Sequence, residues 1–308
     1  MTTRLLRLLT SVAALLLFAL PAHAQAAEVD IITPHITDAH ELEIPWPSWP
    51  EMHKVVHLPR WETFPLPGTS IMVDMSPTKH VVWMLISAFT VCVLLIFAAN
   101  AQGRQTRAVG HSKGFAGGIE AMVLYIRNEV VMPNVGPHGN AFAPYLLTLF
   151  FFILFCNLWG IFPWGSTATG NIAVTATLAL ITFFVIEIAG MRAQGLGYFS
   201  TIFYWNKDMP LPLRIMMFVI LSPIEVIGKL TKPFALTIRL FANMTAGHMV
   251  VLALIGMIFS FRSYAIGLAP LVMAIAINLL ELFVAFLQAF IFTMLSSVFI
   301  GQIRVSHH

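Results

Sequence analysis

Long apolar segments separated by short polar breaks dominate the chain from residue 81 onward. Five of these segments are long enough to cross the ~30 Å hydrocarbon core of a bilayer as α-helices. They cover residues 81–100, 141–164, 171–191, 215–260 and the run from the polar break at 262–264 to about residue 300. The pattern predicts an all-α polytopic membrane protein with about five transmembrane helices.

The polar loop at residues 101–140 contains one further helical segment. Within residues 119–131, apolar side chains are mixed with Glu120, Arg127 and Glu129. Such a segment is typical of an amphipathic helix that lies at the membrane surface. The pattern does not assign a role to either glutamate.

The last two helices are expected to be long and steeply inclined. At 1.5 Å per residue the final apolar run extends ~55 Å, whereas the hydrocarbon core measures ~30 Å. A usual tilt of ~20° does not absorb that excess. We therefore expect both helices to be steeply inclined, or the last one to bend at Pro270.

The first residues predict a signal peptide at residues 1–24. Arg4 and Arg7 precede an apolar run at about 8–20, and Ala-His-Ala at 22–24 provides a small-x-small cleavage site. An uncleaved anchor helix is the alternative. Cleavage would leave the mature amino end outside the cytoplasm.

A polar extension follows at residues 25–78. Its prolines disfavour helices and central strands, so we expect an extracytoplasmic, proline-rich segment without either. The pattern does not predict its purpose. The transmembrane domain then covers residues 79–308.

Composition supports a membrane protein and excludes several functional classes. Hydrophobic residues make up 58% of the chain and charged residues 10%, the mean hydropathy is +0.83, and soluble domains carry about 25% charged residues. The net charge of +3 is small, so no nucleic-acid partner is expected. Cys92 and Cys156 both lie in apolar runs, and no metal-ligand spacing, nucleotide loop or nucleophile elbow occurs. We expect no metal, no cofactor and no enzymatic activity in this chain.

Loop charge and the signal peptide predict the same orientation. With the mature amino end outside, the loops after the first and third spans and the carboxyl-terminal tail lie in the cytoplasm. These segments hold nearly all loop cations: Arg104, Arg107, Lys113, Arg127, Arg192, Lys207, Arg214 and Arg304. Since cytoplasmic loops are enriched in Lys and Arg, we expect a multi-pass protein of the bacterial plasma (inner) membrane with its carboxyl end in the cytoplasm.

Arg239 is the charge that the membrane tolerates least. It lies within an apolar stretch, away from both polar breaks. An arginine at mid-membrane costs about 3 kcal/mol on insertion scales, and it stays protonated. Arg239 must therefore face water or a carboxylate; a structural salt bridge to Glu225 or Glu281 of its own chain is the alternative.

Proton-exchanging groups lie at matching depth on the last two helices. In an antiparallel hairpin, residues at equal depth have position numbers with a constant sum. The numbers of Arg239 and Gln288 add to 527, and those of His248 and Glu281 add to 529. Both sums place the turn near Tyr264, where the polar break lies.

Helical phase separates these groups into two directions. At about 100° per residue, Glu281 and Gln288 share a face, as do Arg239 and Asn243. His248 points about 180° away from Arg239. We expect Arg239 to face a partner and His248 to face a separate aqueous path.

At these residues the chain resembles subunit a of F-type ATP synthases. The resemblance rests on the segments at 238–248 and 281–292, and more weakly on those at 157–160 and 222–225. It covers residue 81 onward; residues 1–78 lie outside it. In many bacterial members a Glu and a His occupy the places of His248 and Glu281, so this bacterial chain carries the exchanged pair of mitochondrial members.

The resemblance implies a stator proton channel. Arg239 matches the arginine that faces the carboxylate of the rotating c-ring, Gln288 the glutamine close to it, and Glu225 an acid beside the cytoplasmic half-channel. Two offset half-channels would load and unload protons on c-ring carboxylates to drive ATP synthesis. The implied partners are the c-ring, the subunit b stalk, F1 indirectly, and membrane lipid. The His–Glu pair favours protons over sodium.

Two other classes of membrane protein, a redox subunit and a secondary transporter, are alternatives to this interpretation. A haem-bearing membrane redox subunit needs axial histidines at membrane depth, but only His248 lies deep, since His80 lies at a span edge. A secondary transporter commonly shows internal repeats and paired broken helices, and the sequence shows neither.

Overall fold

The computed structural model describes residues 37–45, 53–65, 72–109, 114–162, 165–203, 210–261 and 264–304. The signal peptide expected at residues 1–24 lies outside these ranges. Within them, five helical segments are long and apolar enough to cross a membrane. This confirms the prediction of an all-α polytopic membrane protein.

The helical elements follow one another with short connections. They are α3 (Lys79–Val109), α4 (Gly114–Tyr125), the π-helical η1 (Ile126–Val131), α5 (Met132–Val135), η2 (Gly136–His138), α6 (Gly139–Ile161), η3 (Ala168–Gly170), α7 (Ile172–Gln194), η4 (Gly195–Gly197), α8 (Tyr198–Ile202), α9 (Leu211–Phe261) and α10 (Tyr264–Arg304). The five predicted spans correspond to α3, α6, α7, α9 and α10.

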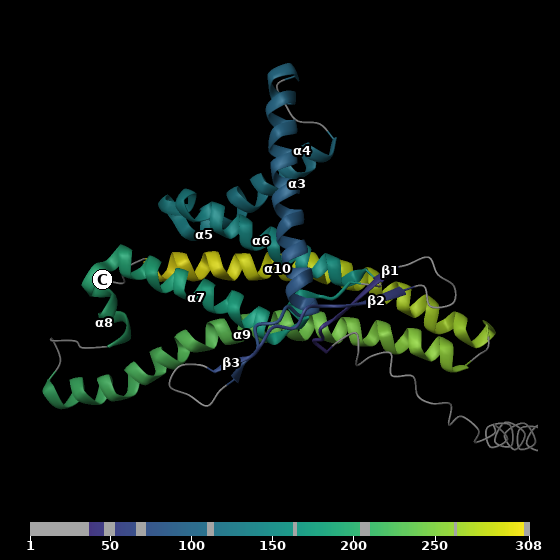
Figure 1. The fold of residues 1–308 in the computed structure, drawn as a ribbon. Coiled ribbons are helices and arrows are strands. Elements are labelled where there is room, and N and C mark those ends of the chain that lie inside the picture. Colours follow the sequence, from purple (N-terminus) through teal and green to yellow (C-terminus); the bar gives the residue numbers. More distant parts are fainter. Residues whose placement is uncertain are drawn as a thin grey trace, which may run out of the picture.

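Helix α10 lies at the centre of the packed region. It contacts α9, α6 and α7, and α7 also contacts α9. In Figure 1 these four helices lie roughly along one another, and α3 crosses them at a large angle. Fully buried apolar side chains lie between them, among them Leu146, Phe151, Ile153 and Phe292.

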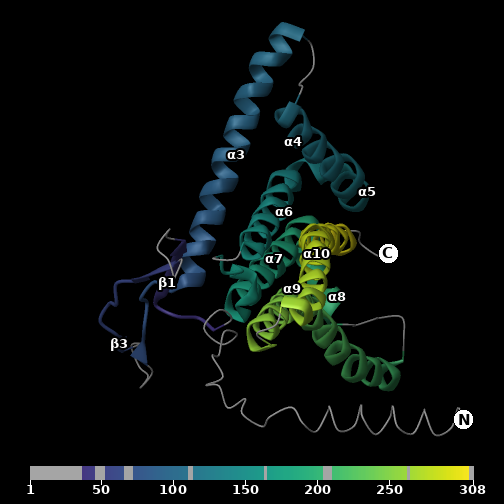
Figure 2. The same ribbon diagram turned by 90° about the vertical axis from the view of Figure 1, so that its right-hand side faces the viewer.

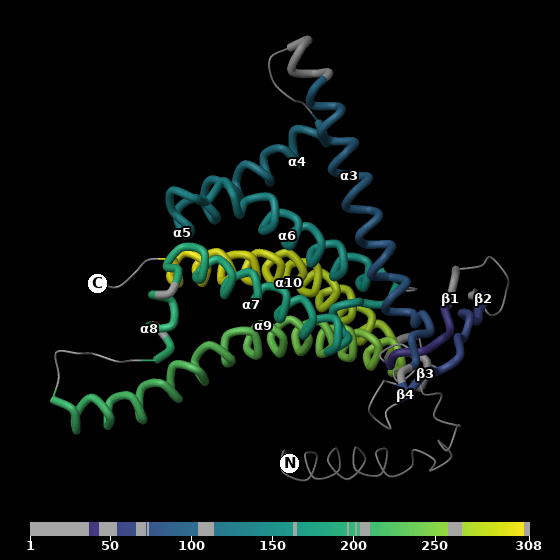
Figure 3. The backbone as a smooth tube through the Cα atoms, turned by 60° about the vertical axis from the view of Figure 1, so that its left-hand side comes forward, coloured from purple at the N-terminus to yellow at the C-terminus, as the bar shows by residue number. Residues whose placement is uncertain are grey.

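Helices α9 and α10 are both far longer than a bilayer core. With 51 and 41 residues, they extend ~77 Å and ~62 Å at 1.5 Å per residue. Figure 3 shows α9 as one curved helix, although it contains Pro223 and Pro233. Helix α10 also continues through Pro270. Long helices crossing α3 at a large angle agree with a steep inclination of both.

The predicted surface segment forms an arm that doubles back onto α6. Helix α4 begins at Gly114, before the expected start at residue 119, and η1 and α5 continue it. The chain then turns at Gly136, whose positive φ of 78° suits glycine. Figure 3 shows the arm leading to one end of α6. The arm packs closely on α10, because a β-carbon at Gly301 would overlap the carbonyl oxygen of Asn134.

The extension folds into two short antiparallel ribbons at the start of α3. Strand β1 (Glu41–Pro45) pairs with β2 (His53–His57), and β3 (Phe64–Pro65) pairs with β4 (Met72–Val73). Every strand of a two-stranded sheet is an edge strand, where proline is tolerated. Figure 2 shows β1 and β3 beside the lower end of α3.

Candidate functional site

Arg239 lies on an exposed face of α9. Leu236, Leu240 and Met244 pack inward, at the three- to four-residue spacing of one helix face. Arg239 is exposed on another face. Its exposed neighbours there are small or polar: Ala235, Ala242, Asn243 and Ala246.

No carboxylate of the described chain neutralises Arg239. No hydrogen bond or ion pair joins it to another residue in the described ranges. Glu225 lies 14 positions earlier on α9, or about 21 Å along the helix. Glu281 is buried on α10. A salt bridge to either glutamate is therefore not formed, and the guanidinium is left open to a partner.

The α9–α10 hairpin has the predicted register. Helix α9 ends at Phe261 and α10 begins at Tyr264, so the turn falls where the sequence placed it. A β-carbon at Gly247 would contact the Glu281 carboxyl group at 3.4 Å. The numbers of these two residues add to 528, between the two predicted sums.

Gln288 faces α9 and is hydrogen-bonded to Asn243 there, not to Arg239. Its side chain is 1% exposed, and its Oε1 accepts a hydrogen bond from Asn243 Nδ2 at 3.0 Å. Asn243 lies one turn after Arg239, on the same exposed face. The structure thus brings Gln288 and Asn243 together, and Asn243 connects the buried amide to the face that carries the guanidinium.

His248 and Glu281 lie at about the same depth of the hairpin, but Glu281 packs against the side of α9 that carries Asn243, because Gly247 lies four residues after Asn243. Glu281 is 6% exposed and rests against Gly247, next to the half-buried His248. Thr245, three residues before His248, donates to the carbonyl oxygen of Gly170 at 3.4 Å. Residues three apart share a helix face, so His248 lies on the side of α9 that faces the α6–α7 turn. This supports the predicted division between the two faces.

A buried polar chain joins the α6–α7 turn to α10. Thr169 Oγ1 donates to Asn157 Oδ1 at 2.5 Å, and Asn157 Nδ2 donates to the Ala285 carbonyl oxygen at 3.3 Å. Asn157 and Thr169 are 1% and 0% exposed. Ala285 lies one turn after Glu281, so the chain ends beside the His248–Glu281 pair. The sequence signalled Asn157 only through the weaker segment at 157–160.

Comparison with known proteins decides the family. The model of the family described as ATP synthase A chain matches residues 81–301. The chain belongs to this family. Members similar to it include ATP synthase subunit a of Chloroherpeton thalassium, 44% identical over 89% of the chain and 76% of the relative. ATP synthase subunit a 2 of Chlorobium luteolum is 45% identical over 91% and 79%. ATP synthase subunit a of Myxococcus xanthus is 44% identical over 77% and 76%.

This ATP synthase A chain family member contains an ion pair that sequence reasoning missed. Lys229 Nζ on α9 lies 3.4 Å from Glu187 Oε2 on α7 and donates to the Tyr198 hydroxyl at 2.6 Å. The side chains of Lys229 and Glu187 are 10% and 16% exposed. Glu187 therefore has the cation of a neighbouring helix as its partner. The two partners are 42 positions apart in the sequence and lie on different helices, so no local spacing indicated the pair.

Removing one partner of this pair is expected to destabilise the α7–α9 packing. Lys229→Met leaves the Glu187 carboxylate without its cation, and breaking a buried pair costs about 3–5 kcal/mol. The partial exposure of both groups favours the lower end. We expect a lower midpoint for thermal unfolding of the detergent-purified complex, and partial recovery in Lys229→Met/Glu187→Leu. Equal midpoints for wild type and Lys229→Met would contradict this role.

Proposed function

We propose that this chain is the non-catalytic stator subunit that carries protons past the c-ring of a rotary ATP synthase. The observation that carries the proposal is the exposed, unpaired Arg239 among small side chains on α9. Small residues let a neighbouring helix approach closely in a membrane. A permanent cation on that face requires an anionic partner, and the described chain supplies none. A carboxylate of a rotating neighbour meets this requirement.

The outer half-channel ends at the pair His248 and Glu281. Both groups exchange protons when their surroundings adjust their pKa values. They lie at about the same depth of the hairpin, and His248 lies on the side of α9 that faces the α6–α7 turn, which supports an extracytoplasmic route to the pair in the predicted orientation. A proton that enters there passes to a ring carboxylate. The neutral carboxyl group then moves into lipid without the large cost of a bare charge.

The inner half-channel begins near Glu225. This residue is exposed on α9, on the cytoplasmic side of Arg239 in the predicted orientation. A protonated ring carboxyl group that returns after nearly a full rotation meets the field of Arg239, which lowers its pKa and favours release. Arg239 keeps its own proton and so blocks a direct leak. The membrane potential supplies about 2.3 kcal/mol per proton for each 100 mV.

Disulfide cross-linking tests the proposed ring contact. In a background with the exposed Cys92 changed to serine, Ala242→Cys places a thiol on the Arg239 face. We expect oxidation to join it to cysteines introduced into the carboxylate-bearing helix of a small ring subunit. Ile181→Cys, exposed on α7, is the matched control and should stay uncoupled. A face that cross-links only to subunit b or to lipid-facing probes would refute the proposal.

A further inference from the structure

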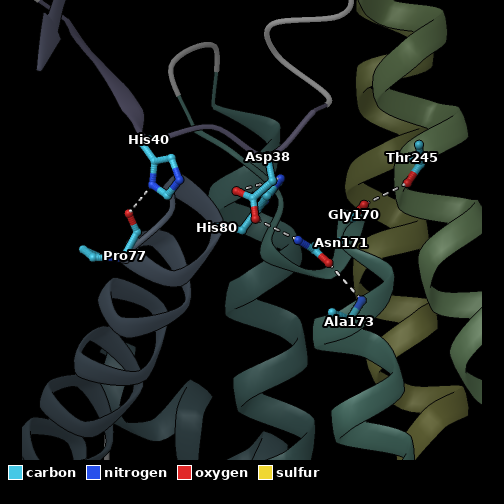
Figure 4. A network of polar contacts seen from close by, with 8 residues as sticks. All are labelled: Asp38, His40, Pro77, His80, Gly170, Asn171, Ala173 and Thr245. Atoms are coloured by element: carbon cyan, nitrogen blue, oxygen red, sulfur yellow. Dashed lines mark hydrogen bonds and ion pairs between the residues drawn. The ribbon is translucent and has the colours of Figure 1, made fainter. Parts of the chain in front are cut away.

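A polar network joins the extension to the end of the membrane domain where α3 begins (Figure 4). Asp38 Oδ1 lies 3.9 Å from His80 Nε2 at the start of α3. The other carboxylate oxygen, Oδ2, accepts a hydrogen bond from Asn171 Nδ2 at 3.1 Å. Asn171 in turn caps α7 by accepting from the Ala173 amide at 2.9 Å. One acid of the extension therefore contacts two elements of the membrane domain.

The two titratable partners differ sharply in their access to solvent. The Asp38 side chain is 32% exposed, whereas that of His80 is 4% exposed. A carboxylate open to water thus lies against an imidazole that is closed to it. Carboxylate and imidazole are the side chains that exchange protons most readily between acidic and neutral pH. Of the two, Asp38 is the group that bulk water reaches directly.

Few other charges face this pair. Lys79, next to His80, is 6% exposed, and its amide nitrogen donates to the Ala39 carbonyl oxygen at 2.9 Å. On the extension, His40 Nε2 lies 4.0 Å from Asp74 Oδ2. The Ser76 side chain and amide bond Asp74 and lower the pKa of its carboxyl group.

The α6–α7 turn connects this network with the proposed proton path. Asn171 lies at one end of the turn, against Asp38. Gly170 accepts from Thr245 on α9, three residues before His248. Thr169 bonds Asn157, which bonds the Ala285 carbonyl oxygen on α10. A single short turn therefore touches the extension on one side and the helices of His248 and Glu281 on the other.

We propose that Asp38 and His80 form a proton-collecting site at the extracytoplasmic mouth of the outer half-channel. A proton from bulk water binds the Asp38 carboxylate and passes to Nε2 of His80, directly or through one bridging water. The imidazolium then releases its Nδ1 proton inward to a channel water, which leaves Asp38 ionised and His80 neutral with its proton on Nε2. Proton exchange through water returns His80 to the tautomer with an unprotonated Nε2 before the next cycle. One proton moves inward per cycle, and no bond other than those to the proton changes. The inference rests on the proposed function and assigns a purpose to the extension.

A site that collects protons matters most when protons are scarce outside. A charged cleft raises the association rate of an oppositely charged ion about 10- to 1000-fold. A single carboxylate is expected to give an increase at the low end of this range. The test uses the whole complex in proteoliposomes with the extracytoplasmic face inward, at a constant total proton-motive force. ATP synthesis is measured while the lumenal pH varies from about 5.5 to about 8, across the range in which imidazole titrates.

Asp38→Asn and His80→Gln keep the size and polarity of the side chains but remove proton exchange. We expect synthesis to fall about three- to tenfold at the high lumenal pH, in keeping with the low end of that steering effect, and to approach wild type at the low pH. Asp38→Glu should restore the rate. The control pair is Glu41 and His57, 3.4 Å apart, exposed, and on the ribbon only. Glu41→Gln and His57→Gln should match wild type at every pH.

Two outcomes would overturn the inference. Wild-type rates for Asp38→Asn and His80→Gln at every lumenal pH would show that protons do not pass through the pair. An equal fractional loss at every pH, together with less assembled complex, would show that the network only fastens the extension. Arg239→Ala in the same series separates this inference from the proposed function, because synthesis by that variant would contradict the function itself.

Discussion

Replacing Arg239 by alanine is expected to abolish proton-driven ATP synthesis while the complex still assembles. The guanidinium is exposed and makes no hydrogen bond or ion pair within the described chain, so its loss breaks no internal contact. Without the cation, nothing lowers the pKa of a passing ring carboxyl group, and the barrier between the half-channels is lost. We expect a drop of about 100-fold from this effect, because a charge within about 4–6 Å shifts a carboxyl pKa by 1–3 units, which changes the release equilibrium by about 10- to 1000-fold.

The measurement is ATP synthesis in inverted membrane vesicles, with the amount of assembled complex determined by immunoblot. Arg239→Lys should also fail, because lysine deprotonates more readily and lacks the planar fork. Arg127→Ala is the matched control. Arg127 lies on η1 and, within the described chain, its guanidinium bonds only the polar side chains of Asn128 and Asn140 at an exposed position, so near-normal synthesis is expected. Near-normal rates in Arg239→Ala would reject the assignment.

Glu281→Gln should reduce ATP-driven proton pumping by about 100-fold or more, the usual contribution of a positioned acid–base group. The amide fills the same buried space beside Gly247 but exchanges no proton. Quenching of a pH-sensitive dye in inverted vesicles reports pumping. Glu120→Gln is the control: Glu120 accepts a hydrogen bond from Gln102 at 2.6 Å on the α3–α4 side, and pumping should be unchanged.

An exchange of the two groups sharpens the test. His248→Glu/Glu281→His keeps one acid and one imidazole at the same depth of the hairpin. We expect this double variant to pump clearly better than Glu281→Gln, because proton exchange is retained. Pumping as low as in the single variant would show that the depth of the pair is not sufficient for its function.

The depth of the polar residues, the number of membrane spans and the register of the α9–α10 hairpin followed directly from the sequence. Apolar length fixes the spans, since a bilayer sets the number of residues a helix needs. The constant sum of position numbers in an antiparallel hairpin predicted Glu281 opposite residue 248. In the structure Glu281 lies against Gly247. Helical phase separated Arg239 from His248, because both lie on the single helix α9 and its period holds between them.

Contacts between distant elements did not follow from the sequence. The pairs Lys229–Glu187 and Asp38–His80 each join residues about 40 positions apart, on elements whose relative rotation no periodicity reveals. The resemblance suggested that Gln288 lies near Arg239, but the hydrogen bond of Gln288 to Asn243, one turn after Arg239, did not follow from the sequence. The resemblance also did not cover the extension, whose ribbons carry Asp38 to the α6–α7 turn.

The most direct test of the account is the distance from the Arg239 guanidinium to the nearest carboxylate in a structure of the assembled complex. The account predicts that an acid of a ring subunit comes within about 4 Å in at least one rotary position, or is bridged by one water. An Arg239 side chain held by Glu225 or Glu281 of its own chain in every rotary position would contradict it.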